Sequence, residues 1–102
     1  MDTIELKATS WKSINDFYDA ILRAIGAPEW HGRSPDALVD SMIWGGINAL
    51  EPPYTIRIVG TAATPENVRD CIDTTRWAIE EGRKDYQKQL GGDIGVTIEI
   101  IS

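Results

Sequence analysis

The stretch that decides the fold is Tyr54-Thr55-Ile56-Arg57-Ile58-Val59-Gly60-Thr61-Ala62-Ala63-Thr64-Pro65-Glu66, because a predicted strand ends in it and a predicted helix begins in it. Residues 54–59 are a short run rich in β-branched side chains, which is typical of a strand. Thr64-Pro65-Glu66 supplies a capping residue, a proline at the first helical position and an acidic first turn. The stretch therefore predicts a strand at 54–59 and a helix that starts at residue 65.

Downstream of this stretch, residues with the spacing of a helix face continue for 26 positions, from 65 to 90. The residues that recur every three or four positions are Val68, Ile72, Thr75, Ile79, Gly82, Tyr86 and Leu90. One helix of that length would measure about 39 Å, whereas a domain of this size has a radius of gyration of roughly 13 Å. We therefore expect the helix to overhang the body or to kink, and Gly82 is the natural place for a kink. Gly91-Gly92 should end it.

Upstream, the chain begins with an alternating segment and an amphipathic helix. Residues 3–7 place Ile4 and Leu6 on one side, which predicts a strand. The helix is predicted by apolar residues at i, i+3, i+4, i+7, i+8 and i+11, namely Ile14, Phe17, Tyr18, Ile21, Leu22 and Ile25. Ser13 or Asn15 can cap its start, and Gly26 should stop it.

A second helix should follow a loop at residues 27–34. Ser34 is a suitable cap, and Pro35 stands where proline is tolerated, at the first helical position. This helix should run to about Trp44 and end at Gly45-Gly46. A final alternating segment at residues 96–101 predicts the last strand.

These elements follow one another in the order β-α-α-β-α-β. Helices between successive strands favour parallel pairing through right-handed crossovers. We therefore expect an α/β fold in which a three-stranded, mostly parallel sheet is covered by helices. The 102 residues should form a single domain, residues 1–102, with one ordinary core.

Composition narrows the choice of partners and of compartment. Ten basic residues face sixteen acidic ones, giving a net charge of −6. Such a chain repels nucleic acid and anionic membranes and attracts a basic partner, although acidity can also serve solubility alone. Cys71 is the lone cysteine, and we expect neither a secretory signal nor a membrane-spanning run. We therefore interpret the chain as a cytoplasmic protein.

The second helix has an unusual outer side. Leu38 and Met42 should face the core, so Asp36 and Asp40 should point outward together with Val39 and Ile43. Like charges one turn apart cost a few tenths of a kcal/mol, and the helix dipole favours only the one in the first turn. Two interpretations stay open: a solvated helix face, or an acidic patch with an apolar rim that enters a basic protein cleft.

Catalysis and metal binding have little support. His31 is the only histidine and lies far in sequence from Cys71, which we expect to be a packed thiol. An acid–base pair of Asp36 and Asp40 is disfavoured because no concave apolar pocket is suggested nearby. A metal site built from Asp36, Asp40 and His31 matches no ligand motif. We therefore expect no enzyme activity, no cofactor and no metal. Trp30 lies in a Pro/Gly loop and is either a lid on the core or a partner anchor. The other tryptophans, Trp11, Trp44 and Trp77, should be core or half-buried.

The run Pro28-Glu29-Trp30-His31-Gly32-Arg33-Ser34-Pro35-Asp36-Ala37-Leu38-Val39-Asp40 resembles the barstar family of intracellular inhibitors of barnase-type ribonucleases. That family shows Pro-Glu-aromatic-aromatic-Gly and then Asp-Ala-Leu-aromatic-Asp at the same spacing. The resemblance extends to the first helix and to residues 96–102, and it is weakest over 60–95. It implies a three-stranded parallel sheet with helices.

The resemblance also implies a mode of action. Family members place the loop and the second helix into the active site of the ribonuclease. Asp36 and Asp40 match the two acidic contacts, and Asp40 would take the place of a substrate phosphate. Trp30 would pack on the enzyme, and Gly32 matches the glycine that lets the loop approach closely. The implied function is an immunity protein that neutralises a cytotoxic ribonuclease.

Departures from the family pattern bear on the target. Val39 stands where the family has an aromatic rim contact, and His31 replaces the second loop aromatic. His31 is therefore either a surface residue without a role or an interface contact. The family also has an acidic contact on its last helix, for which Glu80 is favoured over Asp70 and Asp73. The expected partner is a basic extracellular-type ribonuclease or a related nuclease toxin, bound 1:1. The alternative is a barstar-like module that binds another basic toxin or a regulatory protein.

Overall fold

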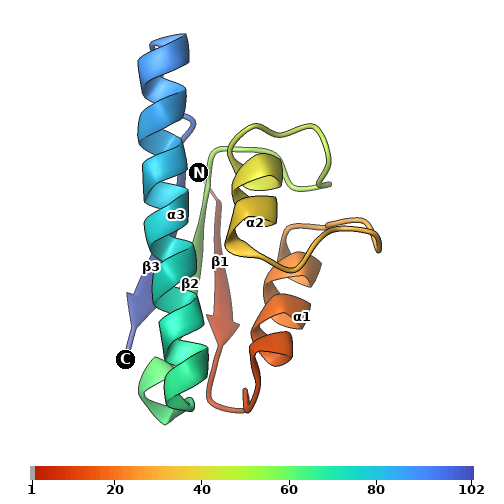
Figure 1. Cartoon of the computed structure of the whole chain (residues 1–102), viewed down its shortest axis with the longest axis vertical. Helices are drawn as coiled ribbons and strands as arrows, with labels where there is room; N and C mark the ends of the chain where they lie inside the picture. The colour runs from red at the N-terminus through yellow and green to blue at the C-terminus, as the bar shows by residue number, and fades with distance from the viewer. Residues whose placement is uncertain (1) are drawn as a thin grey trace.

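The computed structural model describes residues 2–102 and shows the element order that the sequence predicts (Figure 1). Its elements are β1 (Asp2–Lys7), α1 (Ile14–Ala24), α2 (Pro35–Met42), β2 (Tyr54–Val59), η1 (Thr61–Ala63), α3 (Glu66–Leu90) and β3 (Val96–Ile101). The predicted strand at 54–59 is confirmed at both ends. Only the short 3₁₀ turn η1 was not predicted.

The three strands form one parallel sheet in the order β1-β2-β3. β2 is the central strand, and Ile56 pairs with Ile4 on one side and with Ile98 on the other. Because α1 and α2 connect β1 to β2 and α3 connects β2 to β3, each crossover carries a helix, as parallel pairing requires. The predicted sheet is confirmed, and it is parallel throughout.

The helices cover one face of this sheet, so the domain has two layers (Figure 1). Side chains that alternate toward the helices are buried, with Tyr54, Ile56 and Ile58 of β2 at 1%, 0% and 0% exposure. The opposite face carries polar pairs between β2 and β3, including a Thr55–Thr97 hydrogen bond of 2.8 Å. The core therefore lies between the sheet and the three helices.

α1 begins with a capping box. The Ser13 hydroxyl accepts a hydrogen bond from the Asp16 backbone N–H, and the Asp16 carboxylate accepts from the backbone N–H groups of Lys12 and Ser13. These bonds, Lys12 first, lower the pKa of the Asp16 carboxyl below its ordinary value. Ser13 rather than Asn15 is thus the cap, and it fixes the face of α1 that buries Phe17.

α3 is one continuous helix of 25 residues that extends beyond the end of the sheet (Figure 1). The alternative of a kink at Gly82 is therefore wrong, and the overhang is confirmed. Gly82 is buried, and a Cβ placed on it would lie 2.8 Å from Cγ1 of Val39 and 3.2 Å from Cγ1 of Ile43. The glycine serves a close approach between α2 and α3 instead of a bend.

The start of α3 differs by one position from the prediction. Pro65 is the N-cap residue, whereas we expected Thr64 to cap and Pro65 to open the helix. The Thr64 hydroxyl donates instead to the carbonyl oxygen of Thr61 at 2.6 Å, inside the short turn η1. The Thr64 hydroxyl is thus hydrogen-bonded within the turn η1 and does not cap α3.

The tryptophans divide between the core and the surface. Trp11 is 7% exposed, and Trp44 is 42% exposed with its ring centroid 5.4 Å from that of Tyr86. Trp77 is 62% exposed, so the expectation of a buried or half-buried ring is wrong there. Trp77 lies two residues from the buried Thr75 and Ile79, which places it on the opposite side of α3. Among the described residues, no helix is both long and apolar enough to cross a membrane.

Candidate partner-binding site

α2 is anchored on its inner side and at its first turn. The Ser34 hydroxyl accepts a hydrogen bond from the Ala37 backbone N–H at 3.1 Å, and Pro35 occupies the first position as predicted. Leu38 and Met42 are buried in the core at 0% and 1% exposure. The helix ends at Met42, two residues earlier than expected. α2 is thus a short helix whose inner side and first turn are held in place by the rest of the domain.

The side of α2 toward α3 is apolar and covered. Ile43 is only 1% exposed, so the expectation that it points outward is wrong. Val39 is half-buried, and its Cγ1 lies against Gly82 of α3. The absence of a side chain at Gly82 lets α3 close over these two residues, which removes most of the apolar rim predicted for the acidic patch.

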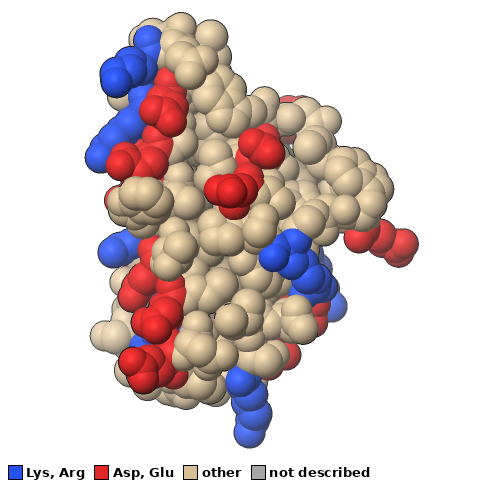
Figure 2. Space-filling view, in the orientation of Figure 1, with Lys and Arg blue, Asp and Glu red and all other residues tan. Residues whose placement is uncertain are grey.

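Asp36 and Asp40 form the exposed side of α2, as predicted. Within residues 2–102, neither carboxylate takes part in an ion pair or a side-chain hydrogen bond. Two other exposed acids are paired within the chain, with Asp19 bound to Arg33 and Asp93 bound to Arg83, each at 2.5 Å. Figure 2 shows acidic side chains over α2, on the same face of the molecule as acidic side chains along α3. The α2 carboxylates remain free for a partner.

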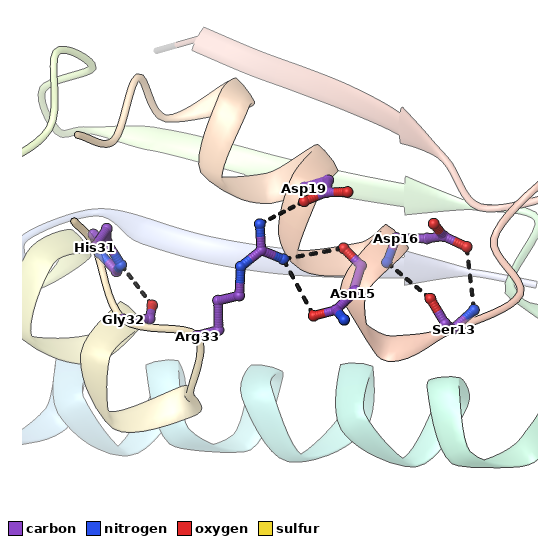
Figure 3. Close-up of polar contacts among 7 residues, drawn as sticks. All are labelled: Ser13, Asn15, Asp16, Asp19, His31, Gly32 and Arg33. Carbon is purple, nitrogen blue, oxygen red and sulfur yellow. Dashed lines mark hydrogen bonds and ion pairs between the residues drawn. The ribbon is translucent and has the colours of Figure 1, made fainter. Parts of the chain in front are cut away.

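The loop before α2 is fastened to α1. Arg33 donates hydrogen bonds to the Asp19 carboxylate at 2.5 Å and to Asn15 at 3.3 and 3.4 Å, and it reaches across to α1 in Figure 3. The His31 backbone N–H closes a turn onto the carbonyl of Pro28 at 3.0 Å. Despite these restraints Trp30 is 74% exposed. A large aromatic side chain is therefore presented to solvent by an ordered loop.

His31 is buried, with 7% of its surface exposed, so the expectation of a surface position is wrong. Its Nδ1 lies 2.7 Å from the carbonyl oxygen of Gly32 (Figure 3), and its Nε2 lies 2.6 Å from the hydroxyl of Ser41. Burial follows because both ring nitrogens find hydrogen-bonding groups inside the molecule, which a sequence pattern cannot reveal. The buried ring thus links the loop to α2 beneath the exposed surface.

Gly32 brings the loop close to α2. A Cβ built on Gly32 would lie 3.2 Å from the Cβ of Ala37, which is tighter than most such contacts. Gly32 thus makes a close approach within the chain itself, and the close approach to an enzyme that the resemblance implies stays a prediction. The approach within the chain sets Trp30 beside the exposed side of α2.

A small hollow of about 130 Å³ opens between the loop and α2. Its lining is mostly apolar and includes a single carboxylate; the lining residues are Trp30, His31, Gly32, Ala37, Asp40 and Ile47. Ile47, 39% exposed, was not predicted. Ile47 follows Gly45-Gly46, where the chain turns back toward the loop. This pair of glycines was the only feature of the sequence that could have indicated the position of Ile47. The hollow suits the stem of a long basic side chain whose charged end meets Asp40.

Glu80 does not share this surface. It lies two residues from Gly82, and about 100° per residue places it roughly opposite the direction in which Gly82 meets α2. It lines a separate hollow of about 310 Å³ with Arg83, Lys84, Gln87 and Asp93. Asp85 lies three residues beyond Gly82, so it projects about 60° from the α2 contact and is exposed. Asp85 is thus an exposed acidic residue on the side of α3 toward α2, and the sequence interpretation did not consider it.

The hollow at Glu80 is closed at one end by a bidentate ion pair. Arg83 donates to both oxygens of the Asp93 carboxylate, at 2.7 and 2.5 Å, and the Gly95 N–H donates to the same group at 2.8 Å. The pair raises the pKa of Arg83 and, with the Gly95 bond, lowers the pKa of Asp93 to about 2. These bonds therefore tie α3 to the segment that leads into β3.

Cys71 is packed at the edge of the core, as expected. Its thiol donates a weak hydrogen bond to the Tyr18 hydroxyl at 3.7 Å, and burial together with this thiol raises the pKa of Tyr18. Over residues 2–102, the structure has no group of three His, Cys, Asp or Glu side chains placed to hold a metal ion.

The fold and this site define a small α/β protein with an exposed acidic helix face and an exposed aromatic side chain in the adjoining loop. The family model described as Barstar (barnase inhibitor) matches residues 1–98, so the chain belongs to the barstar family. The match includes residues 60–95, where the resemblance is weakest. A search of curated proteins found no match. Barstar family members are inhibitors that bind a ribonuclease, and they are not enzymes.

Proposed function

We propose that this chain inhibits a cytotoxic ribonuclease of the barnase type by inserting the exposed side of α2 and the loop at 27–34 into its active site. The observation that carries the proposal is the pair of unpartnered carboxylates on α2, Asp36 and Asp40, beside the hollow lined by Trp30 and Ile47. A ribonuclease active site holds basic groups that bind phosphate, so a fixed carboxylate is a natural competitor for it.

Each part of the surface has a separate task. Asp40 borders the hollow, so it would occupy the place of a substrate phosphate. Asp36, one turn earlier, would meet a second basic group of the enzyme. Trp30 would pack on the enzyme, and large aromatic side chains that become buried in an interface are among the residues that contribute most to affinity. Because the inner side of α2 is fixed in the core, little ordering is needed on binding.

The acidic surface would continue onto α3 through Asp85. Asp85 is exposed on the side of α3 that faces α2, whereas Glu80 points away from it. We therefore expect Asp85→Asn to weaken binding more than Glu80→Gln, although both remove one negative charge. Equal effects of the two substitutions would show that only net charge matters on α3.

The direct test is inhibition of a purified barnase-type ribonuclease. We expect complete inhibition at one molar equivalent, a 1:1 complex in light scattering, and affinity that falls as salt rises. Asp40→Ala should weaken inhibition far more than Val39→Ala, because Val39 is half-buried against α3. If a panel of such ribonucleases is unaffected while another basic toxin is captured, the chain is a barstar-like module with a different target.

The same proposal places the protein in the cytoplasm of the cell that makes the toxin. There it would act as an immunity protein, because the producing cell must neutralise the enzyme before export. Deleting the gene should sensitise that cell to its own ribonuclease, and expression of the Asp40→Ala variant should fail to restore protection.

A further inference from the structure

The buried ring of His31 connects the loop directly to α2. Its Nε2 lies 2.6 Å from the Ser41 hydroxyl, and the two residues are ten positions apart in the chain. Both are almost fully enclosed, with 7% and 4% of their surfaces exposed. A side-chain hydrogen bond between two segments at this depth is excluded from water and holds their separation closely.

The chemistry of the neighbours fixes which nitrogen carries the proton. A carbonyl oxygen only accepts, so Nδ1, at 2.7 Å from the Gly32 carbonyl, must donate. When the ring is neutral, Nε2 is therefore the acceptor, and the Ser41 hydroxyl donates to it. The other acceptor for that hydroxyl, the Leu38 carbonyl, is distant at 3.5 Å. We call this pair of bonds the His31–Ser41 clamp.

The position of the clamp in the sequence gives it a functional meaning. His31 directly follows Trp30, and Ser41 directly follows Asp40. Trp30 and Asp40 are the aromatic and the acidic wall of the 130 Å³ hollow. The hydrogen bond between His31 and Ser41 therefore sets the distance between Trp30 and Asp40, the residues that precede them in the chain.

We infer that His31 and Ser41 are positioning residues that hold Trp30 and Asp40 apart at a fixed separation before the partner arrives. The inference deepens the proposed inhibitory function and rests on it. Without the clamp the partner would have to order the loop, and the free energy used for ordering would be lost from binding. The clamp thus determines affinity without touching the partner.

The fold does not depend on the clamp. α2 keeps its Ser34 cap and the buried side chains of Leu38 and Met42. The loop keeps its attachment to α1 through Arg33 and Asp19. Ser41→Ala removes one hydroxyl and leaves a good helix former, so the variant should fold. His31→Asn, which retains a donor near Nδ1 but nothing at Nε2, is a second way to open the same bond.

The first test uses the free protein. In the wild type, the ¹⁵N shifts of the neutral ring should report a protonated Nδ1 and an unprotonated Nε2. Ser41→Ala should leave the proton on Nδ1 but shift the Nε2 resonance, because that nitrogen loses its hydrogen-bond donor, and it should speed amide exchange at Trp30, His31 and Gly32 several-fold. Thr64→Val is the matched control, because it removes another buried hydroxyl bond, at the start of α3. Loop exchange that is as slow in Ser41→Ala as in the control would overturn the inference, whether or not a ribonuclease binds.

The second test is a double-mutant cycle on ribonuclease binding. Ser41→Ala should weaken binding about five- to tenfold with an unchanged salt dependence, since no charge is removed. In the Trp30→Ala background the same change should cost much less, because the clamp acts through Trp30. A full effect in that background, or none in the wild type, overturns the inference. If the wild type itself inhibits no ribonuclease while Ser41→Ala loosens the loop, the proposed function fails and the clamp stands.

Discussion

Substitution of Gly82 by alanine tests how closely α2 and α3 must approach. Gly82 is buried in the middle of α3, and an added Cβ would meet Cγ1 of Val39 at 2.8 Å and Cγ1 of Ile43 at 3.2 Å. The first distance is shorter than real Cβ contacts allow. Both neighbours are β-branched and stiff at χ1, so neither can rotate away cheaply. The helices must therefore separate.

Two opposing effects set the magnitude. Alanine favours the interior of a helix over glycine by about 1 kcal/mol, whereas overpacking a closed contact costs about 1–3 kcal/mol. The net expectation is a loss of roughly 1 kcal/mol in the free energy of unfolding, which lowers Tm by about 4–8 °C in a domain of this size. Binding should weaken as well, because α2 carries Asp36 and Asp40.

Urea and thermal unfolding of Gly82→Ala measure the first effect. The double variant Gly82→Ala with Val39→Ala is the internal control, since it removes the atom nearest to the new methyl group. Its cost should fall below the sum of the two single changes. If Gly82→Ala raises the free energy of unfolding by the full helix-propensity difference, the contact between α2 and α3 accommodates a methyl group without cost. That result would contradict the predicted overpacking.

Three further substitutions test local features. Because Arg83 and the Gly95 N–H lower the pKa of Asp93 to about 2 from its ordinary 3.8, the stability from Asp93 is present above pH 3.8 and is lost as pH falls toward 2. Urea midpoints of Asp93→Asn should therefore fall below the wild type at pH 5 and converge with it near pH 2. Burial raises the pKa of Tyr54 from 10 to about 12, so its stabilisation declines as pH rises from 10 to 12. Tyr54→Phe should show a shallower loss of stability over that range, and equal slopes would contradict it. Ser34→Ala should cost about 1 kcal/mol of unfolding free energy, while the exposed Ser10→Ala should change it little.

The elements with a clear local signal were predictable from sequence. The strand at 54–59 has a β-branched run and the helix start at Pro35 has a cap and a proline, and both lie where expected. The length of α3 followed from its three-and-four spacing. Its straightness did not, because the role of Gly82 depends on Val39, which is 43 positions away in the chain.

Errors at the candidate site have the same physical origin. Asp36, Asp40 and Trp30 are exposed as predicted, since charge and loop position decide exposure locally. His31 was misplaced because its burial depends on a hydrogen bond to Ser41, a contact between segments that periodicity cannot show. Glu80 was favoured over Asp70 and Asp73, and Asp85 was not considered, because only the position of α2 distinguishes the two sides of α3.

The most direct measurement of the central claim is the dissociation constant for a barnase-type ribonuclease with wild type, Asp40→Asn and Asp70→Asn. Asp70→Asn is the matched control, because it removes the same charge from an exposed position about 18 Å along α3 from Gly82, the residue that contacts α2. The proposal predicts tight 1:1 binding, a loss of about 10- to 150-fold for Asp40→Asn from a charged hydrogen bond of about 1.5–3 kcal/mol, and little change for Asp70→Asn. Equal affinity of the wild type and Asp40→Asn would contradict the claim that α2 enters the active site.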